Sequence, residues 1–348
     1  MAWFDKPTLI IVGLQFIYAG FILFTKRAFA IGLNPRMFDF YRQLFATLSM
    51  IPVCYLSRRN APMGTSVGLK GLGYIFVAAL FGLTGNQNLY FEGVELASST
   101  IGGAMVNLIP AITFVIATTL GLEKINLKSF TSLAKILGTI ICVTGAVIMT
   151  LLKGPELFSA SLRSADWLYG SLFCFAGACC FSIWLILQVP VAKYCPDNKL
   201  STLWMNFFGT LQAAVVALIV DRELKAWELH STFIIVGLIC CGVGSSVSII
   251  GQAYCVTRRG PVFSAMFNPL TTVIVVVLAA IFLQDKVYIA SLLGAIVMIA
   301  GLYIVLWGKS RDRKEGQESN QMPQIDETTT VQVDLEEPFL SNRQSPAA

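Results

Sequence analysis

Long apolar segments separated by short polar connections run through most of the sequence. A helix needs about 20 mainly apolar residues to cross the hydrocarbon core of a bilayer. Segments of that length predict ten transmembrane helices and therefore an all-α polytopic membrane protein. The predicted spans are residues 8–25, 35–56, 71–91, 98–120, 130–152, 166–188, 200–220, 231–256, 261–283 and 287–307.

The second half of the sequence repeats features of the first half. Residues 104–107 read Ala-Met-Val-Asn, and residues 265–268 read Ala-Met-Phe-Asn. We therefore predict two copies of a five-helix unit. Because five is odd, the second copy enters the membrane with the opposite orientation, which gives an inverted repeat. The positions that match are Asn107 with Asn268, Pro110 with Pro269, Gly138 with Gly294, and Gly145 with Gly301.

The domain organisation follows from these repeats and from changes in composition. Residues 1–153 form the first predicted repeat, residues 154–165 a polar connecting loop, and residues 166–308 the second repeat. Residues 309–348 are rich in Glu, Gln, Ser, Thr and Pro, and they have too little apolar surface to form a core. We predict that this last segment is a disordered cytoplasmic tail.

The composition agrees with a membrane protein and limits the expected partners. Of the 348 residues, 55% are hydrophobic and 13% are charged, and the mean hydropathy is +0.70. Soluble domains carry about 25% charged residues. The net charge of +5 does not indicate a nucleic-acid partner, because the basic residues lie in connections between spans. The expected partners are the lipid bilayer and a small-molecule substrate, and the oligomeric state, including a homo-oligomer, is left open.

The basic residues of the connections predict the orientation of the chain. If the amino terminus is cytoplasmic, 14 Lys and Arg residues lie on the cytoplasmic side and 8 lie on the opposite side. Cytoplasmic connections are generally richer in these residues. We therefore predict that both termini are cytoplasmic.

Polar residues within the first-half spans are candidates for a transport pathway. A buried amide without a partner in hydrocarbon costs several kcal/mol, so these side chains should face protein or a water-filled cavity. Packing between helices is the alternative for each of them. Pro110, one turn after Asn107, is expected to kink its helix, and such interruptions mark the binding sites of many transporters. The candidate amides are Gln15, Asn86, Gln87 and Asn107.

Arg42 is the one Arg or Lys that we place clearly inside a span. It follows Asp39 by three residues, so the two side chains share a helix face and a local ion pair is one interpretation. The other is that Arg42 binds a substrate carboxylate, because charges inside a membrane are functional candidates by default. No Asp or Glu is expected deep within a span. We therefore predict facilitated diffusion, or coupling through groups near span ends such as Asp39, Glu92 or Glu95.

The second half contributes a matching set of candidates. Trp184 and Gln188 are four residues apart and share a helix face toward the end of the sixth span. Gln252 lies in the eighth span. Asn268 and Pro269 lie early in the ninth span, at the repeat positions of the first-half kink, so a second kink is expected there.

Other function classes have little support in the sequence. We find no Gly-rich phosphate loop, no His and Cys cluster with metal-ligand spacing and no nucleophile with a suitable base, so we predict neither an enzyme nor a cofactor or metal site. A channel would show rings of charge or a carbonyl-rich filter, and neither stands out. A membrane receptor or scaffold acting through the tail is the non-transport alternative.

Several motifs together resemble a known transporter family. They resemble the plant nodulin-like EamA transporters, also called walls-are-thin-related proteins or UMAMITs, of the drug/metabolite transporter superfamily. The resemblance covers nearly the whole chain up to the tail. The motifs are Phe-Tyr-Arg-Gln at 40–43, Gly-Asn-Gln-Asn-Leu-Tyr at 85–90, Ala-Met-Val-Asn-Leu-Ile-Pro at 104–110, Leu-Glu-Lys at 122–124, Phe-Ser-Ala-Met-Phe-Asn-Pro-Leu at 263–270 and Gly-Leu-Tyr-Ile-Val-Leu-Trp-Gly-Lys at 301–309.

This resemblance implies a ten-span bundle with a central cavity, a plant source, and movement of amino acids across the plasma membrane or vacuolar membrane. Some relatives handle auxin, an indole carboxylate. We thus predict a bidirectional facilitator or exporter of amino acids that works by alternating access, with transport of auxin or another small aromatic acid as the alternative. Substrate contacts are expected from amides of the third, fourth and ninth spans and from Arg42.

Overall fold

The computed structural model describes the protein as a set of helices. It describes residues 5–59, 67–97, 99–123, 130–151, 164–220, 227, 229, 231–282, 293–305, 307–308 and 311. All regular secondary structure among these residues is helical, which confirms the predicted all-α class. Most of the predicted connecting loop and tail lies outside the described residues. The helices are α1 (Lys6–Ala30), α2 (Pro35–Arg59), α3 (Leu69–Ala79), η1 (Leu80–Gly85), α4 (Asn86–Leu96), α5 (Ser99–Val106), α6 (Ile109–Thr119), α7 (Phe130–Leu151), α8 (Ser164–Tyr194), α9 (Asn198–Val220), α10 (Thr232–Arg259), α11 (Pro261–Met266) and α12 (Asn268–Phe282), followed by a helix at Leu293–Val305.

Most of these helices are suited to a membrane. In the described part of the chain, 7 helices are long and apolar enough to cross a bilayer, and α7 and the Leu293–Val305 helix contribute shorter apolar stretches. α2 has 25 residues but is not among the 7, because polar residues such as Asp39 and Arg42 lower its hydropathy. The structure therefore shows a polytopic membrane protein, and the count of ten spans stays a prediction.

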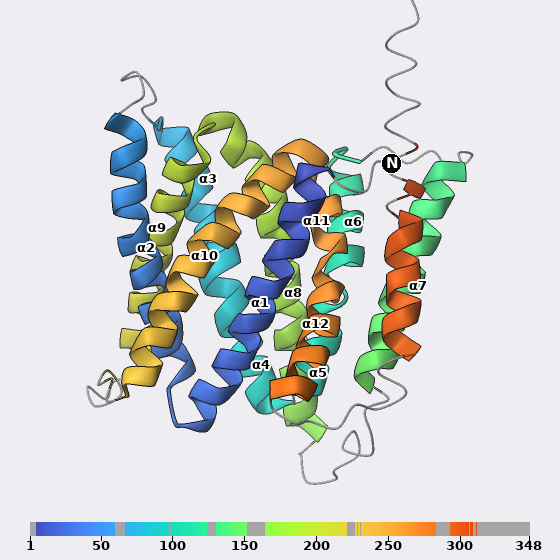
Figure 1. Ribbon diagram of the computed structural model, residues 1–348, viewed down its shortest axis with the longest axis horizontal. Helices are drawn as coiled ribbons and strands as arrows, with labels where there is room; N and C mark the ends of the chain where they lie inside the picture. Colours follow the sequence, from blue (N-terminus) through green and yellow to red (C-terminus); the bar gives the residue numbers. More distant parts are fainter. Residues whose placement is uncertain are drawn as a thin grey trace, which may run out of the picture.

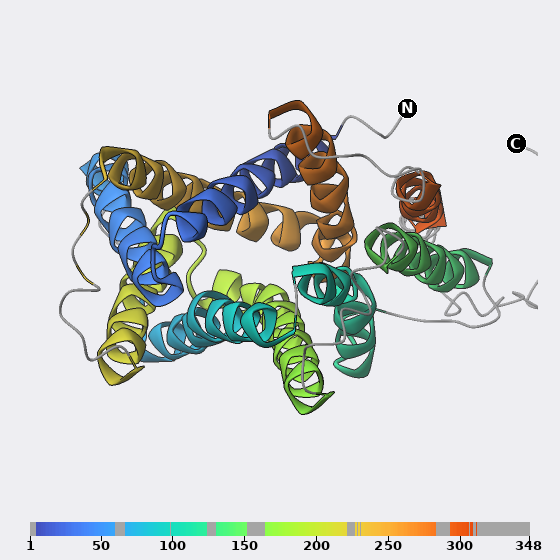
Figure 2. The ribbon, with the colours of Figure 1, turned by 90° about the horizontal axis from the view of Figure 1, so that it is seen from below.

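The helices form a bundle in which the two halves of the chain interleave (Figures 1 and 2). α2 packs against α9 and α10, and α4 packs against α8, so extensive contacts join the halves. α1 and α8, the first helices of the two halves, run in opposite directions in Figure 1. An inverted repeat requires these opposite directions. The interior of the bundle is therefore built from both repeats.

Matching glycines bring the last helices of the two repeats together. α7 and the Leu293–Val305 helix lie side by side at one edge of the bundle (Figures 1 and 2). A Cβ atom on Gly301 would lie 2.3 Å from the Cys142 backbone nitrogen, and one on Gly145 would lie 2.8 Å from the Gly294 carbonyl oxygen. Small residues allow this close approach of backbones between membrane helices. The glycines that repeat in the sequence thus form a contact between the repeats.

Both repeats contain a broken helix. Asn107 and Leu108 separate α5 from α6, and Phe267 separates α11 from α12. Pro110 and Pro269 lie in the first turns of the helices that follow, where a missing backbone N–H leaves no helical hydrogen bond unmade. At each proline the structure has a short break between two helices in place of a simple kink. The side chains of Asn107 and Phe267, at the two breaks, are buried.

α7 contains a buried cation whose surroundings in the sequence are apolar. Lys135 is 5% exposed, and its Nζ lies 3.8 Å from a carboxylate oxygen of Glu123, which follows α6. The prediction that Arg42 is the one cation inside a span is therefore wrong. The nearby carboxylate offsets part of the desolvation cost of the Lys135 ammonium group.

We expect Gly301→Ala to lower the melting temperature of the detergent-purified protein by about 3–6 °C, because the added methyl group overpacks a backbone contact at a cost of about 1–3 kcal/mol. The matched control is Gly13→Ala on α1, where no atom lies within 4 Å of the added Cβ. The control should melt at the wild-type temperature or slightly above it. Equal melting temperatures for the two variants would contradict the tight contact.

Candidate functional site

The broken helices are joined by side-chain hydrogen bonds in the interior of the bundle. Thr272 Oγ1 donates to Asn107 Oδ1 at 3.1 Å and links α12 to the break between α5 and α6. Thr271 Oγ1 donates to Gln15 Oε1 and links α12 to α1. Asn268 lies one turn before Thr272 on the same helix. We call Gln15, Asn107, Asn268, Thr271 and Thr272 the broken-helix cluster.

The amides of the broken-helix cluster are enclosed by protein. Gln15 and Asn107 are 0% exposed, and Asn268 is 6% exposed. Gln15 Nε2 also donates to the Ile11 carbonyl oxygen at 3.1 Å, so both ends of this amide are used. Asn268 Nδ2, in contrast, has no partner among the described residues. An unpaired buried donor is unfavourable, so Asn268 is suited to bind a ligand or a water molecule.

α2 carries a second polar group, which contains a buried ion pair. Asp39 and Arg42 are 1% and 7% exposed, and Arg42 Nη2 donates to Asp39 Oδ1 at 2.7 Å. The local ion pair suggested by their spacing is therefore formed. Asp39 Oδ2 and Arg42 Nε nevertheless have no partner in the described part of the chain. Each partner thus keeps one unused hydrogen-bonding position.

Gln43 and residues of α1 and α10 extend this polar region. Gln43 is 0% exposed, and both polar atoms of its amide are without partners among the described residues. Ser248 of α10 lies beside the half-buried Tyr18 of α1, and Tyr18 is within electrostatic range of Arg42. Helices of both repeats therefore converge here. We call Asp39, Arg42 and Gln43 the Arg42 cluster.

One face of α10 extends from the Arg42 cluster toward α11. Ser248 and Gln252 are one turn apart on this face. Gln252 is 0% exposed, and neither its Oε1 nor its Nε2 has a partner in the described residues. α10 packs against α1, α2 and α11, so this face is shared by both repeats. A Cβ atom on the adjacent Gly251 would lie 3.0 Å from the Leu14 side chain, so this part of α10 lies beside the part of α1 that carries Gln15.

Hydrogen bonds across the repeats fix the position of α2 next to α9 and α10. Asn206 Nδ2 donates to Ser246 Oγ at 3.0 Å, and Ser246 Oγ donates to the Ala46 carbonyl oxygen at 3.0 Å. The hydroxyl groups of Thr47 and Thr210 are 3.0 Å apart. These contacts begin one turn after the Arg42 cluster and hold its helix in place. Asn206 is an amide inside a predicted span and was a candidate from the sequence, whereas Thr47, Thr210 and Ser246 did not stand out, because single Ser and Thr residues are common in apolar helices.

An aromatic cluster covers one side of the Arg42 cluster. The Arg42 guanidinium carbon lies 5.7 Å from the centre of the Phe38 ring, a distance typical of cation–π contacts. The Phe38 ring is 6.3 Å from Phe24, 5.7 Å from Phe29 and 6.2 Å from Phe91. The sequence does not reveal this group, because its rings come from distant helices and resemble ordinary lipid-facing residues. The members of the aromatic cluster are Phe24, Phe29, Phe38, Phe91 and Phe233.

Trp184 and Gln188 share a helix face, and this face contacts α9. Trp184 Nε1 and Gln188 Nε2 lie 3.4 Å and 3.8 Å from the Met205 sulfur. The Trp184 ring also fills the space beside Gly82 in the π-helical segment η1, where a Cβ atom would lie 2.1 Å from the ring. The structure therefore places this pair in the packing between α8, α9 and η1. No contact in the described residues joins the pair to the Arg42 cluster.

Asn86 and Gln87 lie at the start of α4 and are half-buried. The Asn86 carbonyl oxygen lies 3.3 Å from the position of a Cβ on Gly177, so the backbone of α4 packs closely on α8. Asn88, the third member of the amide triplet, donates through Nδ2 to the Thr84 carbonyl oxygen at 2.8 Å. That bond stays within one helix, which agrees with a structural role for Asn88.

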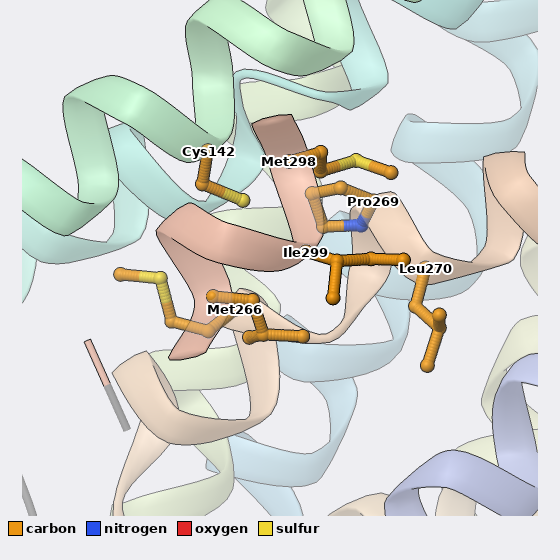
Figure 3. A pocket seen from close by; sticks show the side chains of 7 residues that line it. Cys142, Met266, Pro269, Leu270, Met298 and Ile299 are labelled. Atoms are coloured by element: carbon orange, nitrogen blue, oxygen red, sulfur yellow. The ribbon is translucent and has the colours of Figure 1, made fainter. Parts of the chain in front are cut away.

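A narrow apolar crevice lies at the break between α11 and α12 (Figure 3). It has an empty volume of about 170 Å³, is too narrow to hold a water molecule, and offers no polar surface to a solute. It is therefore unsuited to a polar substrate. Its lining residues are Cys142, Met266, Pro269, Leu270, Met298, Ile299 and Leu302. Within the described residues, no group of 3 or more His, Cys, Asp or Glu side chains is placed to hold a metal ion.

Both halves of the chain match one protein family. A model described as the EamA-like transporter family matches residues 6–151 and again residues 159–307. The chain belongs to the EamA-like transporter family. The double match confirms the predicted duplication of an EamA unit. It also makes the chain a membrane transporter.

Plant members of the EamA family are similar to this chain over most of their length. WAT1-related protein At4g30420 of Arabidopsis thaliana is 44% identical, with 95% of this chain and 96% of the relative covered. Protein WALLS ARE THIN 1 of Arabidopsis thaliana is 35% identical, with 86% of this chain and 82% of the relative covered. A crystal structure that is 16% identical shares the fold with a TM-score of 0.67, covering 88% of this chain and 98% of the other. The resemblance to plant EamA transporters is thus confirmed.

We expect the Asn107–Thr272 hydrogen bond to stabilise this EamA fold by about 1 kcal/mol, which is within the range for hydrogen bonds between membrane helices. A double-mutant cycle with Asn107→Ala and Thr272→Ala, measured as unfolding in detergent mixtures, gives the coupling energy directly. The matched control cycle combines Asn107→Ala with Thr210→Ala, which contact different helices. The control coupling should be close to zero. Additive effects in the first cycle would contradict the link between α12 and the helix break.

Proposed function

We propose that this EamA transporter moves amino acids in both directions by alternating access, in the plasma membrane or the vacuolar membrane, with both termini cytoplasmic. One observation carries the proposal: in the described residues, buried polar atoms without partners gather on helices of both repeats. Among them are Asp39 Oδ2, Arg42 Nε, both amide atoms of Gln43 and Gln252, and Asn268 Nδ2. Such atoms are unfavourable in a membrane bundle unless a polar solute or water reaches them.

The chemistry of these atoms suits an amino acid. Arg42 offers N–H groups to a carboxylate, and a guanidinium group binds carboxylates through paired hydrogen bonds. The amide oxygens of Gln43 and Gln252 accept hydrogen bonds, as an ammonium group requires. Gln15 and Asn107 hold the broken helices next to this site. In the same proposal, Asn86 and Gln87 of α4 and Trp184 and Gln188 of α8 form another part of the pathway wall.

Contacts at both ends of the bundle support alternating access. Arg259 at the end of α10 forms an ion pair with Asp5 before α1, which joins the repeats at one end. At the end where α2 begins, Tyr41 donates through its hydroxyl to the Trp227 carbonyl oxygen at 2.8 Å and joins the repeats again. An inverted repeat can open one end while the other stays closed. In this proposal the two links break in turn as the transporter opens to each side.

An aromatic carboxylic acid such as auxin is the second candidate substrate. The observation in its favour is the aromatic cluster, because Phe38 lies against the Arg42 guanidinium group. An indole ring could stack among these phenylalanine rings while its carboxylate binds Arg42. The cluster equally serves as an apolar seal at one end of the pathway, so amino acids remain the first candidate.

Uptake into liposomes that contain the purified full-length protein tests both candidates. Saturable entry of labelled glutamine that stops at equal concentrations supports the amino-acid transporter. Entry of labelled indole acetate alone favours the aromatic acid. Entry of neither would overturn both and favour the receptor or scaffold. Deleting residues 310–348 separates these classes, because transport should survive the deletion whereas a scaffold acting through the tail should lose its partners.

We expect Arg42→Gln to reduce kcat/KM for glutamine about 10- to 100-fold, because a charge-assisted hydrogen bond to the carboxylate contributes about 1.5–3 kcal/mol. The control is Arg36→Gln on the same helix, which removes a partly exposed ion pair to Glu92 at 2.8 Å. An exposed pair contributes little, so this variant should keep most of the wild-type rate. Equal effects of the two substitutions would argue against Arg42 as the carboxylate site.

Asn107→Leu and Asn268→Leu test the broken-helix cluster in the same assay, with the amount of inserted protein measured for each. Each is expected to lower glutamine uptake at least about 5-fold, because a lost hydrogen bond of about 1 kcal/mol is combined with an added apolar side chain in the site. Asn88→Leu is the matched control, since its amide bonds within its own helix. Unchanged uptake in both variants would remove the cluster from the site.

A further inference from the structure

The Asp39–Arg42 ion pair stands out among the buried groups because it is already a receptor for two opposite charges. We propose that Asp39 is the second half of the substrate site: the pair opens, Arg42 binds the substrate carboxylate, and Asp39 binds the substrate ammonium group. This inference rests on the proposed transport of amino acids and deepens it. It makes Asp39 the residue that selects zwitterions over simple carboxylates.

The geometry of the pair allows this exchange. A single contact of 2.7 Å joins Arg42 Nη2 to Asp39 Oδ1, whereas Arg42 Nε and Asp39 Oδ2 have no partner in the described residues. Two parallel hydrogen bonds between a guanidinium and a carboxylate are stronger than one. A substrate carboxylate can form that paired contact once Asp39 turns away. The two residues are three apart on one helix, so both remain at the same wall of the site.

The charges around the pair explain why an ammonium group is needed. α2 packs against α4, α9 and α10. From α4, Glu92 faces the Arg36 side chain of α2 and holds it at 2.8 Å. From α9, Lys199 bonds to Ser57 at the opposite end of α2. The described cations Arg36 and Lys199 therefore have partners of their own, away from the pair.

Other groups of the described residues near the pair are not cations. Cys241 of α10 and Tyr18 of α1 are two titratable groups within electrostatic range of Arg42. Tyr41, on α2 itself, bonds to the Trp227 carbonyl oxygen. When a substrate carboxylate takes Arg42, Asp39 therefore becomes a buried anion without a counter-charge among the described residues. The ammonium group of an amino acid restores the charge balance, so Asp39 does not need to be protonated. A simple carboxylate has no ammonium group and leaves Asp39 without a counter-charge.

The amide oxygen of Gln43, next to the pair, adds to the ammonium site. An ammonium group donates three hydrogen bonds, of which one goes to Asp39 in this proposal. Gln43 follows Arg42 directly in the sequence, and its Oε1 lacks a partner among the described residues. This oxygen is available as an acceptor for a second ammonium hydrogen. The amide of Gln43 also has an unused donor for the second carboxylate oxygen.

The test compares glutamine with glutaramate, which is glutamine without its α-amino group. The uptake of each labelled compound is measured in liposomes that contain the full-length protein. The selectivity is the kcat/KM for glutamine divided by the kcat/KM for glutaramate. We expect the wild type to prefer glutamine at least about 10-fold, and Asp39→Asn to bring the ratio to about one or below, because the charge-assisted bond to the ammonium group is lost. The ratio is measured within each protein, so it does not depend on how much of a variant folds.

Two further variants separate binding from structural support. Asp39→Glu keeps the carboxylate and should keep the preference for glutamine, even if transport is slower. Glu92→Gln breaks the other ion pair of α2 and should leave the ratio at its wild-type value. If Asp39→Asn keeps the wild-type ratio, or lowers both rates equally, Asp39 has only a structural role and the inference is wrong.

A competition experiment on the wild type gives an answer that needs no variant. Unlabelled glutaramate should inhibit the uptake of labelled glutamine at least about 10-fold more weakly than unlabelled glutamine does. Equal inhibition would overturn the role of Asp39 while leaving amino-acid transport intact. A wild type that transports neither compound would instead overturn the proposed function, so the two failures are distinguishable.

Discussion

Hydrocarbon offers no hydrogen-bond partner, and this constraint determines where the polar side chains of the bundle lie. The amides of Gln15, Asn107 and Gln252 are each 0% exposed, although they come from helices of both repeats. Some of them satisfy one another through α12, as Asn107 does with Thr272. Others, such as the amides of Gln43 on α2 and Gln252 on α10, remain unpaired in the described residues. The same constraint therefore makes the polar interior both a link between helices and a receptor for solutes.

The duplicated design explains why this interior forms between the repeats. The helices that break, α5–α6 in one half and α11–α12 in the other, meet through Asn107 and Thr272. The last helices of the repeats meet through glycines at matching positions, including Gly145 and Gly301. Contacts between equivalent elements are expected when an inverted repeat folds around its own axis. Each half thus leaves a polar surface that the other half covers.

Much of the architecture could be predicted from the sequence, because the signals for it are local. Apolar length predicted the helices, and the spacing of Asn107 and Pro110 predicted an interruption that the repeat then showed again at Asn268 and Pro269. The ion pair of Asp39 and Arg42 also follows from spacing on one helix. These features depend on neighbours within one or two turns, which the sequence displays directly.

Features that depend on contacts between distant segments could not be predicted in this way. Lys135 reads as a charge in an apolar helix, and the Glu123 carboxylate that accompanies it comes from the preceding connection. Trp184 has helical spacing with Gln188, but the space it fills is created by Gly82 in the π-helical segment η1. The aromatic cluster around Phe38 likewise gathers rings from α1, α2, α4 and α10. In each case the position of the residue in the structure depends on a partner from a distant segment, which the local sequence does not reveal.

The ion pair of α2 also has a consequence for the biogenesis of the protein. Asp39 and Arg42 are one turn apart and contact each other without help from another helix. A helix that enters a bilayer with an isolated charge at its centre meets a large energetic barrier, and pairing within the helix lowers that barrier. α2, the least apolar of the long helices, can therefore leave the translocation machinery with this pair of charges neutralised, before its neighbours have been synthesised. The ion pair that eases insertion of α2 is thus the same contact that opens when a substrate binds in the proposed mechanism.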